Sequence, residues 1–285
     1  LVKSTGTFGF YTIISRLLGY LRDVLIAIFL GTSFVADAFF VASRIPNTFR
    51  RLFAEGTFNA AFIPSYTSAR IENKTKGKRF ADDILGSLLL ILILIVTVVE
   101  IFTPYLVLII APGFVENSTK FNLAIELTRI TFPFLIFISL SSFFSGILNS
   151  NNKFAAAAAA PIILNIILIL SLIISYKLNL NFANQLSYGV TLAGVLQLVF
   201  LFFVTLKFYK PTLTLRLKAN NKVKNFFKKL LPSIFSSGIT QINILIGTII
   251  ASYEAGAVSY LYYADRIYQI NLAIAGIAVG TVSLP

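Results

Sequence analysis

Residues 84–110 read ILGSLLLILILIVTVVEIFTPYLVLII, an apolar run with a single charged side chain, Glu100. A helix needs about 20 such residues to cross roughly 30 Å of hydrocarbon, so this run is long enough to span a membrane. An open sheet would leave backbone groups unsatisfied in lipid, whereas a helix satisfies them within the segment. The run therefore predicts an all-α membrane protein.

The whole chain has the composition of a polytopic membrane protein. It has 285 residues, of which 57% are hydrophobic and only 12% are charged. Its mean hydropathy is +0.85, and an average soluble domain is about 25% charged. About eight transmembrane helices are predicted, at residues 7–30, 33–68, 84–110, 122–148, 155–176, 187–207, 230–253 and 257–282.

The first two of these spans are not simple apolar crossings. The first is interpreted as a retained membrane helix and not a signal peptide, because Arg16 and Arg22 interrupt it and no small-residue cleavage site follows. The second, 33–68, is too long for one simple crossing. Pro46 and Pro64 within it indicate that it bends or continues beyond the membrane.

Missing residue types exclude several kinds of chemistry. The chain has no cysteine and no histidine. Disulfides, thiolate metal sites and a cysteine nucleophile are therefore excluded. The commonest zinc ligands and the commonest general base are absent as well. This composition favours a protein that is not an enzyme and has no cofactor.

Basic residues alternate between the connections that join the predicted spans. The connections near 69–83, 149–154 and 207–229 are basic, whereas the odd-numbered connections hold only Lys120 and Lys177. Cytoplasmic loops carry such an excess of Lys and Arg, so the N-terminus is predicted to be cytoplasmic. The net charge of +13 is then explained by topology and lipid headgroups and not by nucleic-acid binding.

Two arginines within the first span call for a compensating partner. Each arginine in the middle of a bilayer costs roughly 2.5 to 3.5 kcal/mol. Residues seven apart nearly align on a helix, which pairs Ser15 with Arg22 and Arg16 with Asp23. Both arginines thus occupy one broad polar sector, which predicts a cavity lining.

The second span carries a similar stripe. Its members fall within about 40° of one another on an ideal helix and are Asp37, Arg44, Arg51 and Glu55. Arg50 points elsewhere on that helix, unless a kink at Pro46 changes the register.

Internal salt bridges, such as Arg16 with Asp23 or Arg22 with Asp37, are one explanation for these charges. Snorkelling of Arg44 and Arg51 to the interface is another. Neither covers the whole set, because the first two spans hold two more arginines than carboxylates, before Arg266 is counted. Guanidinium groups bind phosphate through bidentate hydrogen bonds, so the surplus predicts an anionic, phosphate-bearing ligand.

A short internal sequence repeat suggests that the protein is built from two related halves. Two similar four-residue segments each follow an aromatic-rich helix start. They are Ala42-Ser43-Arg44-Ile45 and, later in the chain, Ala264-Asp265-Arg266-Ile267. Transporters are commonly built from two such halves. The predicted division is a six-helix lobe with a basic cytoplasmic linker at 1–222 and the first two helices of a second lobe at 223–285.

Several motifs closely resemble the MurJ (MviN) family of lipid II flippases. The resemblance covers essentially the whole chain, and residues 45–56 are its most specific part. The motifs are Ser15-Arg16-Leu17-Leu18-Gly19, Arg22-Asp23, Ala36 to Ala42, Ile45-Pro46-Asn47, Arg50 to Gly56, Ala111 to Phe114, Thr131-Phe132-Pro133, Gly146 to Asn149, Ala160-Pro161, Leu164-Asn165, Gly194 to Gln197 and Tyr262 to Arg266.

The resemblance implies a MATE-like transporter of the MOP superfamily, a multi-pass protein of the bacterial inner membrane. Such proteins move undecaprenyl-pyrophosphate-linked peptidoglycan precursor from the cytoplasmic to the periplasmic leaflet by alternating access, for cell wall biosynthesis. Their partners are lipid II and membrane lipids, and a monomer is expected. The chain would comprise the N-lobe and the start of the C-lobe.

The resemblance also implies site residues. Substrate binding is assigned to Arg16, Arg22, Asp37, Arg50 and Arg266. Gating or charge pairing is assigned to Ser15, Asp23, Arg51, Glu55 and Asp265. Coupling to a monovalent cation or to the membrane potential is implied, and Asn243 is a candidate contributor to a cation site. The two approaches differ over which arginine faces the cavity. The resemblance implies Arg50, whereas the helix-face angle predicts Arg51.

Alternative functions differ in what they demand of the cavity. A flippase for another polyprenyl-linked oligosaccharide would also use arginines. A MATE-type drug exporter would favour carboxylates or aromatic groups for cationic compounds. A membrane-embedded glycosyltransferase or phosphatase is disfavoured, because the chain has no histidine and no sizeable soluble domain. A non-transporting scaffold is disfavoured because it would leave the arginines unexplained.

Overall fold

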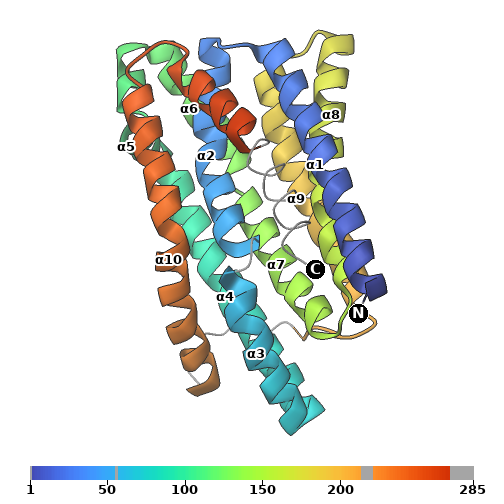
Figure 1. Cartoon of the computed structure of the whole chain (residues 1–285). Helices are drawn as coiled ribbons and strands as arrows, with labels where there is room; N and C mark the ends of the chain where they lie inside the picture. Colours follow the sequence, from blue (N-terminus) through green and yellow to red (C-terminus); the bar gives the residue numbers. More distant parts are fainter. Residues whose placement is uncertain (1, 55–56, 213–220, 270–285) are drawn as a thin grey trace.

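The computed structural model describes residues 2–54, 57–212 and 221–269, and these parts are helical without any strand (Figure 1). A further helix covers 257–269. The other elements are α1 (Val2–Leu30), α2 (Phe34–Ala54), α3 (Thr57–Glu72), α4 (Lys74–Ile101), α5 (Thr103–Ile110), the 3-10 helix η1 (Pro112–Glu116), α6 (Ser118–Thr131), α7 (Phe134–Ser150), α8 (Phe154–Leu178), α9 (Phe182–Thr205) and α10 (Asn221–Ala251).

Helices occupy all eight predicted spans, and the eighth is described to residue 269. Within the described residues, four helical stretches are long and apolar enough to cross a membrane: Lys74–Ile101, Ser118–Ser150, Phe154–Leu178 and Phe182–Thr205. Large apolar side chains also face outward, as at Leu17 (64% exposed) and Ile109 (66%). The predicted fold class, an all-α multi-pass membrane protein, is confirmed.

The boundaries of two predicted segments were wrong. In the second span, α2 and α3 lie on either side of residues 55–56, which are outside the described residues, and α3 continues to Glu72. The basic connection predicted at 69–83 shrinks to Asn73, whose side chain accepts a hydrogen bond from the Thr75 backbone and so caps α4. Hydropathy finds only the apolar part of a helix, whereas the charged turns before residue 84 extend the same helix beyond it.

Close helix packing, not exclusion from water, holds such a bundle together in lipid. Glycines allow the close approach. A Cβ on Gly146 of α7 would lie 2.7 Å from the Phe62 ring of α3, and a Cβ on Gly194 of α9 would lie 2.6 Å from the Phe134 ring of α7. Phe62 stacks in turn on Tyr66, with ring centroids 5.6 Å apart.

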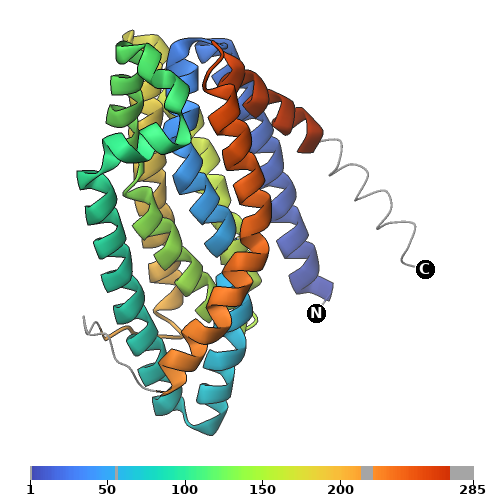
Figure 2. The same ribbon diagram turned by 90° about the vertical axis from the view of Figure 1, so that its left-hand side faces the viewer.

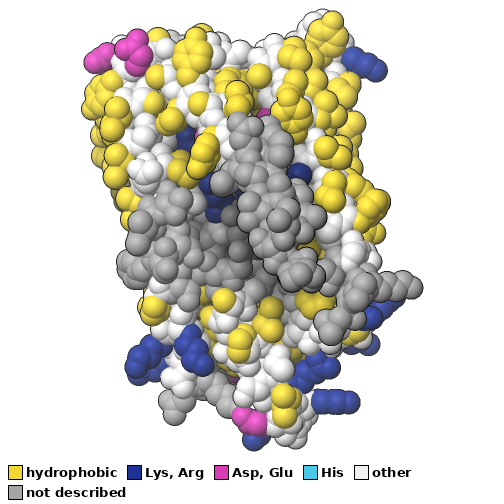
Figure 3. Space-filling view, viewed as in Figure 1, with side chains coloured by type: hydrophobic (Ala, Val, Ile, Leu, Met, Phe, Trp, Pro, Cys, Tyr) yellow, Lys and Arg dark blue, Asp and Glu magenta, His cyan; other side chains and the backbone are white. Residues whose placement is uncertain are grey.

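The even-numbered connections gather at one end of the bundle, as their basic composition predicts. Arg70 donates a 2.6 Å hydrogen bond to Asn151 between α7 and α8, and Lys78 donates one of 2.8 Å to Thr212 after α9. We call this the basic end, and its lysines and arginines gather at the bottom of Figure 3. At the opposite end, α10 meets the helix 257–269 beside the junction of α1 and α2 (Figure 2).

Candidate functional site: a cationic cavity

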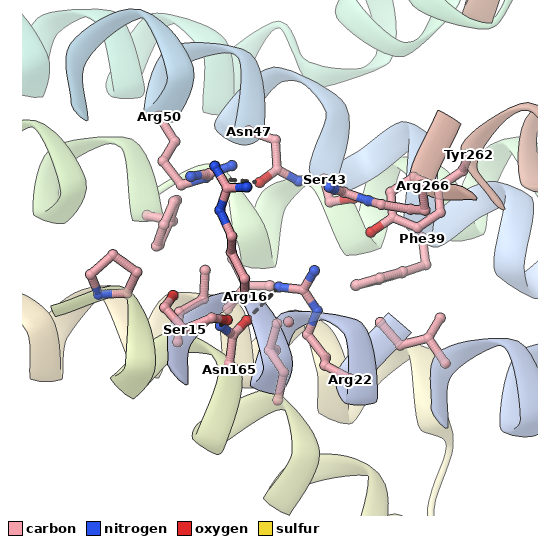
Figure 4. A pocket seen from close by; sticks show the side chains of 17 residues that line it. Ser15, Arg16, Arg22, Phe39, Ser43, Asn47, Arg50, Asn165, Tyr262 and Arg266 are labelled. Carbon is pink, nitrogen blue, oxygen red and sulfur yellow. Dashed lines mark hydrogen bonds between the residues drawn. The ribbon is translucent and has the colours of Figure 1, made fainter. Parts of the chain in front are cut away.

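A cavity of about 240 Å³ lies inside the bundle and is lined from six helices (Figure 4). Four predicted arginines line it: Arg16 and Arg22 from α1, Arg50 from α2 and Arg266 from the helix 257–269. The other lining residues are Ser15, Gly19, Ile26, Phe39, Ser43, Asn47, Phe134, Pro161, Leu164, Asn165, Leu168, Val190 and Tyr262.

The polar sector predicted for the first span is present in α1. Ser15, Gly19, Arg22 and Ile26 follow one another at intervals of four, three and four residues and line the same cavity. Such intervals keep side chains on one face of a helix. Opposite faces carry exposed apolar residues such as Ile28, which suits contact with lipid.

Arg50 and Arg51 belong to adjacent faces of α2. The cavity face runs through Phe39, Ser43, Asn47 and Arg50, at ordinary helical intervals. Arg51 lines a second, smaller pocket instead. The prediction from the helix-face angle, that Arg51 faces the cavity, is therefore wrong. Because α2 continues through Pro46, Arg50 reaches the cavity without a change of helical register.

The second pocket, of about 20 Å³, lies between α2, α10 and the helix 257–269. Its charged lining residues are Arg44, Arg51, Asp265 and Arg266, the last being shared with the larger cavity. Within the described part of the chain, Nε and Nη2 of Arg44 are buried without a hydrogen-bond partner. Asp265 accepts a 2.7 Å hydrogen bond from Gln269.

Asp23 joins two of the cavity arginines. Its Oδ1 lies 2.6 Å from Nη2 of Arg22, and its Oδ2 lies 3.3 Å from Nε of Arg266. The predicted pairing of Arg16 with Asp23 is not formed, because the neighbouring Arg22 and the approaching helix 257–269 occupy the carboxylate. One carboxylate thus connects α1 to the segment that follows α10.

Tyr262 completes this junction. Its hydroxyl donates a 3.1 Å hydrogen bond to Asp23, and its ring stacks on Phe40 with centroids 4.0 Å apart. The guanidinium of Arg266 lies 4.8 Å from the centre of the same ring, a favourable position for a cation. The tyrosine therefore orients both charged partners.

Asn165 of α8 fixes the position of Arg22 from the other side of the cavity. Its Oδ1 accepts a 2.9 Å hydrogen bond from Nη1 of Arg22, and its Nδ2 donates one of 2.8 Å to the Ser15 carbonyl. Gly19 of α1 packs against the same side chain, since a Cβ there would lie in van der Waals contact, 3.5 Å from Asn165. The residue both lines the cavity and bonds a neighbouring helix.

Asp37 lies apart from both pockets. Its side chain is fully buried and pairs with Lys120 of α6, with Nζ 2.7 Å from Oδ2. It also accepts hydrogen bonds from the backbone of Gly256 (3.0 Å) and Ser259 (2.9 Å), and from the Ser259 hydroxyl (2.6 Å). The predicted pairing of Arg22 with Asp37 is therefore wrong, and the substrate-binding role of Asp37 stays a prediction.

The lining of the cavity is basic. Among the described residues it holds four arginines and no carboxylate, and Asp23, outside the lining, pairs with Arg22 and Arg266. Asp37 does not reduce the surplus, since its charge is matched by Lys120. Buried or half-buried cations in a bilayer need compensation, so the cavity suits a multiply charged anion.

The remaining predicted residues fall outside this constellation. Glu55 lies outside the described residues. Asn243 is exposed on α10 and lines neither pocket. Its role in a cation site stays a prediction.

Sequence reasoning missed the roles of Lys120, Asn47 and Tyr262. Lys120 was counted only as a loop charge, although it is 6% exposed. Asn47, whose Oδ1 accepts a 3.5 Å hydrogen bond from Arg50, could have been found from its spacing of three before that arginine. Nothing in the sequence near Lys120 indicates that it meets Asp37, because the two are 83 positions apart.

Comparison with known proteins gives a consistent answer. The family model described as lipid II flippase MurJ matches residues 26–285. A probable lipid II flippase MurJ of Rhizobium tropici is 43% identical over 100% of this chain and 54% of its own length. One from Rickettsia prowazekii is 38% identical over 100% of the chain and 56% of its own length. The chain spans about half the length of these curated relatives.

Solved structures agree on the fold. A structure of lipid II flippase MurJ in an inward closed conformation has a TM-score of 0.83 and 28% identity, over 96% of this chain and 57% of its own. A MATE transporter has a TM-score of 0.63 and 19% identity, over 93% and 59%, and shares the fold alone. With its fold and its cationic cavity, the chain belongs to the lipid II flippase MurJ family.

Proposed function

We propose that this chain forms the first half of a transporter that moves lipid II across the membrane, with the cationic cavity holding the pyrophosphate. The observation that carries the proposal is the convergence of Arg16, Arg22, Arg50 and Arg266 on one cavity. The family membership supports it, and the activity belongs to the whole protein of which this chain covers about half.

The chemistry of the cavity suits a pyrophosphate. Planar guanidinium groups donate paired hydrogen bonds to phosphate oxygens, and they remain charged at any physiological pH. Arg22 and Arg266 are already oriented by Asn165 and Tyr262. A dianionic group would take over the charge compensation that Asp23 supplies to Arg22 and Arg266. No covalent step, cofactor or nucleic acid is needed for this role.

The long lipid tail would stay in the bilayer while the headgroup occupies the cavity. Rocking of the segment 223–285 against 1–222 would expose the headgroup to one side and then the other. Asp23 lies at the contact between these parts, through its pairing with Arg266. Ser15 lines the cationic cavity, and Arg51 and Asp265 line the smaller pocket that shares Arg266 with it. With Asp23 and Glu55 they are the proposed gating residues.

The basic end is proposed to face the cytoplasm of a bacterial inner membrane, which places the N-terminus there as well. Transport would then run from the basic end to the opposite end. A monomer suffices, since the cavity is lined from within one chain. Coupling to a monovalent cation or to the membrane potential is proposed for the whole protein.

The test is complementation in bacteria that are depleted of their own lipid II flippase. The chain, joined to the second half present in its relatives, should support growth, and Arg22→Ala or Arg266→Ala should abolish it at equal expression. Arg79→Ala is the matched control, because Arg79 is exposed at the basic end. Normal growth of both cavity variants would overturn the proposal.

A further inference from the structure

Lys120 is a buried cation with a specific carboxylate partner. It lies in the first turn of α6, is 6% exposed and places Nζ 2.7 Å from Oδ2 of Asp37. Its ammonium also lies 4.0 Å from the centre of the Phe114 ring. It contacts neither pocket, so the cationic cavity does not explain why a charged residue is buried here.

Asp37 has two sets of partners on different parts of the chain. Lys120 and Asp37 both belong to the segment 1–222. The other three donors are the backbone groups of Gly256 and Ser259 and the Ser259 hydroxyl. These donors form the N-terminus of the helix 257–269, where the helix dipole also attracts a negative charge. Asp37 therefore caps a helix that belongs to the segment 223–285.

The cap is part of a contact that closes the end opposite the basic end. The backbone N–H of Gly113 donates a 3.0 Å hydrogen bond to the Ser252 hydroxyl, and the Tyr263 hydroxyl donates one of 2.8 Å to the Gly31 carbonyl. Gly256 adopts a left-handed conformation, with φ of 76°. A side chain there would also approach the Thr32 carbonyl at 3.0 Å. The turn before the helix thus lies directly against α1 and α2.

We propose that Lys120 is a positioning residue for transport: it keeps the Asp37 carboxylate compensated when the helix 257–269 moves away and the opposite end opens. This inference rests on the proposed function, because it assumes that the two segments separate during transport. On separation Asp37 loses three donors at once. Lys120 stays beside it, since α2 and α6 pack against each other.

An isolated buried charge is costly, and Lys120 decides whether Asp37 becomes one. With Lys120 present, the closed arrangement gives Asp37 a cation and three hydrogen bonds, and the open arrangement still leaves it the cation. Without Lys120, the Asp37 carboxylate keeps its hydrogen bonds from Gly256 and Ser259 in the closed arrangement. In the open arrangement it has neither a cation nor these donors. Loss of Lys120 should therefore trap the closed arrangement and leave the binding cavity unchanged.

The test measures opening directly. Val258 is fully buried at this contact, and the chain has no cysteine, so Val258→Cys in a cysteine-free full-length protein is a clean reporter. It is labelled in cells with a membrane-impermeant maleimide. We expect Lys120→Met to lower the labelling rate by at least about tenfold, since an uncompensated buried carboxylate strongly disfavours the open arrangement. Growth should fail as well.

Three further variants separate charge compensation from packing. Lys120→Arg keeps the cation and should restore labelling and growth. Asp37→Asn combined with Lys120→Met removes both charges and should restore labelling relative to Lys120→Met alone. Lys177→Met is the matched control, because Lys177 is an exposed lysine that lines neither pocket, and it should change nothing.

Labelling of Lys120→Met at the reference rate would overturn the proposal. So would a double variant that labels as slowly as the single one, because the defect would then be lost packing. Expression and monodispersity in detergent identify a misfolded variant, and the double variant keeps the test decisive in that case. If labelling responds as expected while the Arg22 and Arg266 variants still support growth, only the proposed function fails.

Discussion

Asp23 places one carboxylate oxygen 2.6 Å from Arg22 and the other 3.3 Å from Arg266, which links α1 to the helix 257–269 across the cationic cavity. Two of the four cavity arginines thus share one counter-ion. The arrangement limits the repulsion between the two guanidinium groups when no ligand is bound.

Loss of this shared counter-ion should lower the stability of the empty protein. We expect Asp23→Asn to cost about 1.5–3 kcal/mol, the usual range for hydrogen bonds to charged groups. The variant should also gain more thermal stability from added inorganic pyrophosphate than the unmodified protein does, since the ligand replaces the missing charge. Thermal unfolding in detergent, with and without pyrophosphate, measures both effects. Asp265→Asn is the comparison, and equal pyrophosphate shifts in the two variants would contradict the prediction.

Asn165→Leu should impair transport by releasing Arg22. The substitution removes the acceptor for Arg22 and the donor to the Ser15 carbonyl, at an expected cost of about 1–3 kcal/mol for the unsatisfied groups. A growth assay at equal expression measures the loss. Asn122→Leu, at an exposed position of α6, should be tolerated, and an equal defect in the two variants would refute a specific role for Asn165.

Substitutions at Tyr262 should separate its hydroxyl from its ring. Tyr262→Phe loses the hydrogen bond to Asp23 and keeps the stacking on Phe40 and the contact with Arg266. Tyr262→Leu loses all three. We expect a modest growth defect for the first and a severe one for the second, with Tyr260→Leu as the exposed control. The reverse order would show that the hydroxyl dominates.

Gly146→Ala should destabilise the bundle. The added Cβ would lie 2.6 Å from Oδ1 of Asn59 and 2.7 Å from the Phe62 ring, and overpacking of this kind costs about 1–3 kcal/mol. Gly9→Ala adds the same methyl group where no atom lies within 4 Å, so it should be neutral or stabilising. The midpoints of thermal unfolding in detergent distinguish the two, and equal midpoints would contradict the packing argument.

The proposed orientation has its own test. Lys76 lies exposed at the basic end, and Lys177 lies exposed in the last turn of α8, at the opposite end. In a cysteine-free protein, Lys177→Cys should react with an impermeant maleimide in intact cells, whereas Lys76→Cys should react only after permeabilisation. The opposite result would invert the topology.

The sequence was sufficient to predict the helices and the residues that share a helix face. Apolar runs located the predicted spans as far as the structure describes them, and the alignment of residues seven apart placed Ser15, Arg16 and Arg22 on one polar sector of α1, where the structure has them. Helix ends were harder to predict, because α4 begins at Lys74, in charged turns that hydropathy does not detect.

Only the tertiary structure decided which charges meet. The rotation of α2 selected Arg50 over Arg51 for the cavity, and the approach of the helix 257–269 gave Asp23 a second arginine. Likewise, α6 brought Lys120 to Asp37. A sequence encodes the period of a helix and hence its faces. The partner that each face meets depends on the rotation and depth of neighbouring helices, which the packing of many side chains sets together.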